Sequence, residues 1–380
     1  MSWRISAKLQ RITFHLCNGF GFAGMLYRAT ACVGFFYASI PFLALSQSYA
    51  APSKPPAPLL AFPVACDTDS DCFIQHYFDY APGPEALDHT CGILTYNGHK
   101  GIDIRVSSPE WKESGFPVLA AAKGKIEIIK DGIPDRALNQ QEIKSSRGLA
   151  PKPSNSVVIN HGNGWRTHYG HLRQGSVIVK PGQEVAQGSL LGLVGLSGST
   201  SFPHLHFHLS YRGQNIDPFT GMTGSEGCDQ AATGRSFWSA EANAKLGYKD
   251  AGVFRTGFSD HFPDYEELDT QKVEINTFPA ESKEFYFWVS LWGIRQGDME
   301  ELKILLPDGD IYQRSDEIEK SSVQGLRGFF YSRNLPLPAG TYHVNYKLRR
   351  LKNKHSPETI INIDRSMEIE PPKELFTSPN

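Results

Sequence analysis

The sequence has almost no excess charge, because 38 lysine and arginine residues are balanced by 40 aspartate and glutamate residues. A nucleic-acid-binding protein would have a marked excess of basic residues, so the net charge of −2 does not indicate that function. No segment repeats at the period of a solenoid protein. The length of 380 residues and the ordinary apolar content instead predict two globular domains.

Long apolar runs are also missing. The run at 33–45 is shorter than the roughly 20 residues that cross a bilayer. It follows Arg28 and precedes a small-x-small site that ends at Ala50, so it predicts an export signal cleaved after Ala50. The alternative is an anchor that stays in the membrane, and a start at Met25 would give a leader of usual length. We expect a periplasmic or secreted protein without a stable membrane anchor.

Cysteine is scarce, and no C-x-x-C pair of the kind that holds structural zinc is present. Two of the six cysteines lie in the leader, and four remain in an exported chain: Cys66, Cys72, Cys91 and Cys228. An even number in an oxidising compartment predicts two disulfides. Four cysteines allow three pairings, and the sequence does not choose among them.

Composition divides the chain into segments. We expect a leader at 1–50, a Pro-rich linker at 51–62, a Gly-punctuated domain at 63–224, a connector at 225–250, a β-sandwich-like domain at 251–370 and a tail at 371–380. The connector has a helical pattern at 238–246, and the polar stretch 131–155 reads as a long loop at the rim of a site.

Short apolar runs between turn residues predict strands in both domains. In the first domain they are 118–130, 156–161, 165–172, 190–194 and 204–211, with a hairpin turn at 163–164. In the second domain they are 284–294, 301–312, 325–335 and 340–351, with the clearest turns at 307–309 and 338–340.

The stretch FPHLHFHL places His204, His206 and His208 at alternate positions. Side chains of a strand alternate between its faces, so the three imidazoles share one face. Leu205 and Phe207 lie on the other face, which reads as core. A polar outer face that happens to be rich in histidine is the alternative interpretation.

A second cluster, HKGIDI, places His99 and Asp103 four residues apart. The glycines at 98 and 101 indicate a turn that leads into a strand, rather than a helix. In a fully extended strand the two Cα atoms would lie about 13 Å apart, so we expect the glycines to bend the chain and bring the side chains together. A third cluster, HYGHL, contains His171, on the same side of its strand as Tyr169.

Two imidazoles and a carboxylate, from His99, Asp103 and His206, suit Zn²⁺ with a fourth position open for water. His171 and His204 remain to move a proton and to stabilise an oxyanion. No HExxH motif is present to supply a helix-borne glutamate base.

In this order, HxxxD, YGHL and PHLHF resemble the lysostaphin/LytM-type zinc metallopeptidases, over about 98–219. The resemblance implies an all-β fold, an antiparallel β-sheet groove of the duplicated hybrid motif type, in the domain at 63–224. It also implies one zinc ion per chain, with His99, Asp103 and His206 as ligands and with His171 and His204 as catalytic residues. One departure is His208, where the family often has glutamate.

We therefore expect an exported zinc endopeptidase that cuts peptidoglycan cross-links or stem peptides. The alternative is a non-enzymatic LytM-like regulator that binds the cell wall or activates an amidase, although such relatives typically lack zinc ligands. A carrier or phosphotransfer domain is disfavoured because its partners are cytoplasmic. If the protein were an adhesin, the five residues that match the family motifs would have no function, which disfavours this alternative. The oligomeric state does not follow from the sequence.

Overall fold

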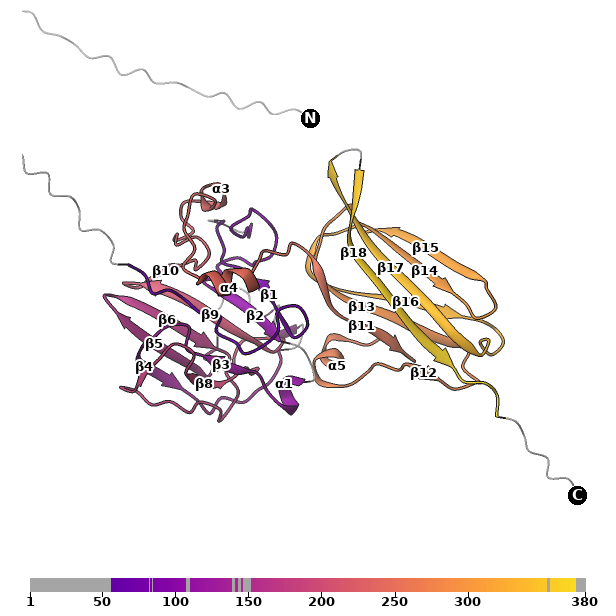
Figure 1. Cartoon of the computed structure of the whole chain (residues 1–380), viewed down its shortest axis with the longest axis horizontal. Coiled ribbons are helices and arrows are strands. Elements are labelled where there is room, and N and C mark those ends of the chain that lie inside the picture. The colour runs from indigo at the N-terminus through magenta and orange to yellow at the C-terminus, as the bar shows by residue number, and fades with distance from the viewer. Residues whose placement is uncertain are drawn as a thin grey trace, which may run out of the picture. The chain divides into compact units, whose positions relative to one another are not determined.

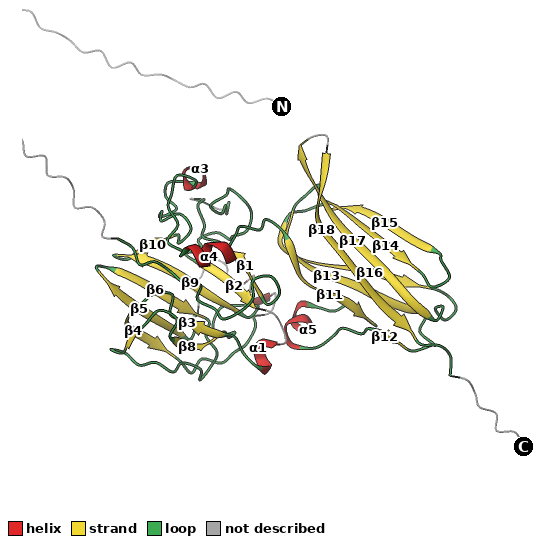
Figure 2. Ribbon diagram, viewed as in Figure 1, coloured by secondary structure: helices red, strands yellow, loops and turns green. Residues whose placement is uncertain are grey.

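The computed structural model of the chain describes residues 56–373, with gaps at 82, 84, 107–109, 139–140, 143–144, 146–151 and 354–355. The predicted export signal and most of the predicted tail lie outside the described residues. The described residues belong to one compact unit. No helix in the described part of the chain is long and apolar enough to cross a membrane. The architecture is all-β, as expected (Figure 2). Most of the sheet pairings are antiparallel.

Eight strands form the largest sheet within the described residues. Its order is β1-β2-β9-β6-β5-β4-β7, with β10 paired to β9, and β4, β5, β6 and β9 can be followed side by side in Figure 1. The strands are β1 (Cys72–His76), β2 (Ile102–Val106), β4 (Gly124–Lys130), β5 (Ser156–Gly162), β6 (Trp165–Gly170), β7 (Glu184–Val185), β9 (His204–Tyr211) and β10 (Gln214–Ile216). The sequence clusters at 99–103 and 204–208 therefore meet where β2 pairs with β9.

The predicted strand at 204–211 is confirmed, and so is its division into two faces. Leu205, Phe207 and Leu209 are fully buried in the hydrophobic core under the sheet. The hairpin at 163–164 is confirmed as well, since it joins β5 to β6 with positive φ angles at Asn163 and Gly164, as a primed turn requires.

The prediction of one strand at 118–130 was wrong. This segment holds the end of β3 (Pro117–Leu119) and the whole of β4, separated by 120–123. β3 pairs with β8 (Leu190–Leu193), whereas β4 pairs with β5, so the chain must leave one sheet for the other. The alanines at 120–122 make this crossing buried and apolar, which is why no turn residue marks it in the sequence.

Two further sheets share a second hydrophobic core and form a β-sandwich, as predicted. One has the order β11-β13-β16 and the other β12-β18-β17-β14-β15. Aromatic side chains meet between them, for example Phe285 and Tyr342, whose ring centroids are 5.6 Å apart. The strands are β11 (Gly252–Ser259), β12 (Thr277–Phe278), β13 (Glu284–Ile294), β14 (Met299–Leu305), β15 (Ile311–Glu317), β16 (Ser322–Ser332), β17 (Gly340–Asn353) and β18 (Ser356–Ile369).

The described helices are short and lie between the strands. α4 (Ala240–Lys245) confirms the helix expected in the connector and is capped by the Ser239 side chain. α5 (Tyr265–Thr270) begins at a capping box formed by Asp264 and Glu267. The other two are α1 (Glu110–Glu113) and α3 (Cys228–Ala231).

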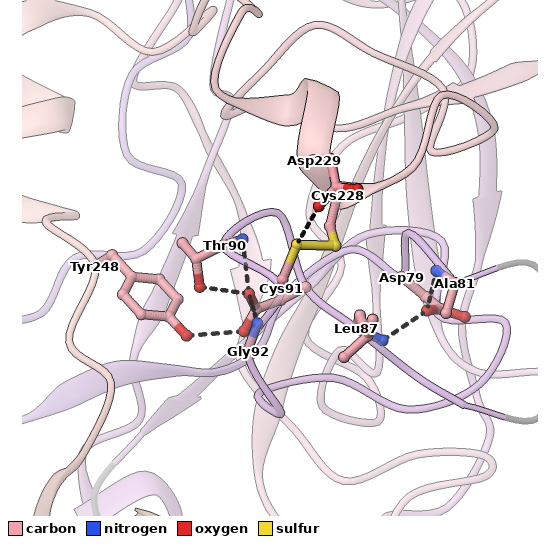
Figure 3. Close-up of a disulfide and its surroundings, with 10 residues drawn as sticks. Asp79, Ala81, Leu87, Thr90, Cys91, Gly92, Cys228, Asp229 and Tyr248 are labelled. Atoms are coloured by element: carbon pink, nitrogen blue, oxygen red, sulfur yellow. Dashed lines mark hydrogen bonds between the residues drawn. A yellow bond between two sulfur atoms is a disulfide. The ribbon is translucent and has the colours of Figure 1, made fainter. Parts of the chain in front are cut away.

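Two disulfides are present, as predicted, and the structure resolves their pairing. Cys66 is bonded to Cys72, the first residue of β1. Cys91 is bonded to Cys228 across 137 residues, at the start of α3 (Figure 3). Beside this second bond, the Asp88 carboxylate accepts hydrogen bonds from the backbone and the hydroxyl group of Thr90. A cross-link over so long a loop strongly restricts the unfolded chain, which favours the folded state.

Candidate metal and catalytic site

The site is built where β2, β9 and the end of β6 lie next to one another. In the antiparallel register, Asp103 of β2 lies opposite His206 of β9, and Gly170 of β6 lies opposite the same histidine. His99 stands in the turn before β2, and His171 directly follows β6. Sheet pairing therefore brings together residues that are more than one hundred positions apart.

Two glycines let His99 approach Asp103, as expected. Gly98 has a φ of 77°, in the left-handed region that favours glycine. At Gly101 there is no room for a side chain, since an added Cβ would lie 2.4 Å from the carbonyl oxygen of Phe207 on β9. The result is a distance of 3.1 Å between His99 Nε2 and Asp103 Oδ1.

We predict that Gly101→Ala destabilises the protein by about 1–3 kcal/mol or more, because the clash is with backbone and cannot be relieved by a rotamer change. Gly247→Ala is the matched control, since nothing lies within 4 Å of a Cβ added there. Urea unfolding of both variants measures the difference. Equal midpoints for the two would contradict the close approach at Gly101.

Three donor atoms converge at the centre of the site. His206 Nδ1 lies 2.8 Å from Asp103 Oδ1 and 3.2 Å from His99 Nε2. With bonds of about 2.0–2.1 Å, the ligand atoms of a tetrahedral zinc ion lie roughly 3.3 Å from one another. The donor set and its spacing therefore fit one Zn²⁺ ion.

A hydrogen bond leaves the converging nitrogen atom of His99 free to bind a metal. His99 Nδ1 donates to the carbonyl oxygen of Tyr77 at 2.7 Å, so the lone pair of the neutral ring is on Nε2, which faces the cluster. Burial lowers the pKa of His206. Burial by itself would raise the pKa of Asp103, but the surrounding histidine rings hold that pKa well below its usual range. Neutral imidazole and ionised carboxylate are the forms that ligate zinc.

His171 and His204 lie beside the three donors. Their ring centroids are 4.6 Å apart, and His204 Nε2 is 3.5 Å from Asp103 Oδ1. Each ring is fixed through Nδ1, which donates to the carbonyl oxygen of Ser197 in one case and of Phe202 in the other. His171 has a φ of 59°, a strained value for a residue with a side chain. Burial, followed by the neighbouring histidines, lowers its pKa to about 3.

The remaining histidines of the motifs have other surroundings. His208 stacks on His168, with ring centroids 4.1 Å apart and planes 5° from parallel. Burial lowers the pKa of His208 well below its ordinary value and that of His168 to about 4. His161 is held at both ring nitrogens, by the Lys123 carbonyl and the Thr167 hydroxyl, which suits a structural role.

Sequence reasoning missed His76. This residue ends β1, and its Nδ1 atom lies 2.9 Å from Asp103 Oδ2. The alternation of side chains along the strand does not predict its position, because the register of β1 against β2 shifts between Ile74 and His76. The five predicted site residues do come together, and their roles as ligands and catalysts stay predictions.

Comparison with known proteins finds similarity over the part of the chain that contains this site. Residues 97–218 match the model of peptidase family M23. The peptidoglycan DD-endopeptidase ShyA of Vibrio cholerae is 43% identical over 67 residues, which is 18% of this chain and 15% of that protein. The DD-carboxypeptidase/endopeptidase Mpg of Neisseria meningitidis is 31% identical over 126 residues, 33% of this chain and 23% of that protein. The chain thus spans less than a quarter of either relative.

A solved structure of a putative peptidase M23 from Pseudomonas aeruginosa also matches. It is 25% identical, and the match covers 43% of this chain and 52% of that chain with a TM-score of 0.26.

Proposed function

We propose that the protein is an exported, zinc-dependent endopeptidase that hydrolyses peptide bonds in the cross-links or stem peptides of peptidoglycan, and the match of residues 97–218 to the model of peptidase family M23 supports this proposal. The observation that carries this proposal is the convergence of one carboxylate and two imidazole donors within about 3 Å of one another. The name of ShyA, a peptidoglycan DD-endopeptidase, supports the substrate class, and the name of Mpg supports endopeptidase activity.

A zinc ion held by His99, Asp103 and His206 would supply a Lewis acid and a bound water of lowered pKa. Nδ1 of His171 and of His204 donates to a backbone carbonyl, so the free base of each ring is at Nε2. A ring in this state accepts a proton at Nε2 and, once charged, donates it to the leaving amine or to an oxyanion. Two such rings beside one ligand set can therefore divide these two tasks.

The test is digestion of isolated peptidoglycan by the purified chain, with identification of the new peptide ends by mass spectrometry. We expect cleavage within the peptides, loss of cleavage after treatment with a zinc chelator, and recovery when zinc is added back. Products that form equally well in the presence of chelator would refute the zinc mechanism. Binding to the wall without any product would favour the non-enzymatic regulator.

A further inference from the structure

The two oxygen atoms of Asp103 face different partners. Oδ1 points to the converging nitrogens, at 3.1 Å from His99 Nε2 and 2.8 Å from His206 Nδ1. Oδ2 points away from them, to His76 Nδ1 at 2.9 Å. The Asp103 carboxylate is buried, so the hydrogen bond from His76 is formed in a place where it is strongly orienting.

His76 reaches this position through an irregularity in β1. Ile74 pairs with Ile104, yet His76 pairs with Asp103, so β1 has one more residue than β2 at this point. Such a bulge re-aims the side chain that follows it. The strand is also held before and beside the bulge, by the disulfide at Cys72 and by a 3.0 Å hydrogen bond between Arg105 and Gln75.

Aromatic neighbours limit rotation of the His76 ring. The edge of this ring meets Tyr96 at a centroid distance of 5.1 Å, and the Phe202 ring lies 5.8 Å away. The side chain is only 13% exposed. Packing of this kind keeps Nδ1 directed at Asp103 without help from the metal.

We propose that His76 is a positioning residue for the metal site: its Nδ1–H group holds Asp103 Oδ2, so that Oδ1 alone is presented as a ligand atom. A carboxylate can bind a metal through one oxygen or two, and an outer hydrogen bond fixes which. A single oxygen leaves the fourth zinc position open for water. This inference rests on the proposed zinc function and concerns how the ligand is oriented.

The experiment compares three variants of the full chain by zinc affinity, measured in competition with a chromophoric chelator. His76→Asn keeps an N–H donor near the place of Nδ1, His76→Gln moves the donor toward the place of Nε2, and His76→Phe keeps the ring shape without a donor. We expect zinc binding 10- to 100-fold weaker for the Phe and Gln variants, as for other lost supports of a ligand, and within a few-fold of the parent for the Asn variant.

Steady-state kinetics with a soluble peptide give a second measurement. At saturating zinc, kcat should fall more than KM rises in the Phe and Gln variants, because the ligand rather than the substrate is misplaced. Thermal unfolding with zinc absent checks that each variant is folded. If His76→Phe does not fold, His76→Gln alone tests the loss of the donor.

Two results would overturn the role of His76. One is a zinc affinity equal to that of the parent in both the Phe and the Gln variants. The other is an Asn variant that binds zinc as weakly as the Phe and Gln variants do. They are distinct from failure of the proposed function, which would show as a parent protein that binds no zinc at all.

Discussion

Asp103→Ala is expected to release the metal and abolish peptide hydrolysis, because Asp103 Oδ1 lies within 3.1 Å of both other donor atoms. His171→Ala and His204→Ala are expected to retain about one zinc per chain while turnover falls by roughly a hundredfold or more, since both rings lie beside the donors and we propose that they carry protons. Elemental analysis of the purified variants, followed by kcat on a soluble peptide, separates the two classes.

His208→Ala is the internal control. Its ring stacks on His168 and is not among the three converging donors. We expect it to keep zinc and most of the activity. If His208→Ala were as inactive as His204→Ala, the roles that we assign to the three histidines of β9 would be wrong. A full zinc content in Asp103→Ala would remove this residue from the ligand set.

The sequence was informative wherever a local rule decides the outcome. Alternation alone predicts the bounds of β9 and the single face shared by its histidines. The two glycines at 98 and 101 indicated a bend, and the structure shows why, since one has positive φ and the other touches β9. The order of the three motifs grouped five residues through its resemblance to a known family, whereas the pairing of β2, β6 and β9 that brings them together is long-range.

Features that depend on long-range pairing were out of reach. The disulfide between Cys91 and Cys228 joins a loop to the first residue of α3, and the two segments have no sequence pattern in common. His76 acts on Asp103 only because β1 pairs with β2 and bulges there. The break at 120–123 follows from the partners that β3 and β4 take in different sheets. None of these features can be predicted from a short segment of neighbouring residues.

Arg105 shows the same limit and bears on the predicted domains. It lies on β2, opposite His204, and its guanidinium is nearly fully buried. Its Nη2 atom lies 2.6 Å from Oδ1 of Asp269 in α5, 164 residues away. Trp292 of β13 likewise packs in the first core and stacks on Phe73 at 3.9 Å. The division into 63–224 and 251–370 stays a prediction, and these contacts cross it.

Asp269→Ala is therefore expected to lower the free energy of unfolding by about 3–5 kcal/mol, because it leaves the buried Arg105 charge without its carboxylate. Glu241→Gln is the matched control: its ion pair with Lys245 lies on the surface, so its loss should cost less than about 1 kcal/mol. The double variant Arg105→Met with Asp269→Leu should recover most of the lost stability, since it removes the charge as well as its partner.

Chemical unfolding of the three proteins gives the values. In Asp269→Ala we also expect weaker zinc binding, since Arg105 is two residues from Asp103 on β2 and opposite His204. Stability within 1 kcal/mol of the parent would show that the pair does not hold α5 against β2. A destabilised protein that keeps its full zinc affinity would show instead that the ion pair supports the fold and leaves the metal site unaffected.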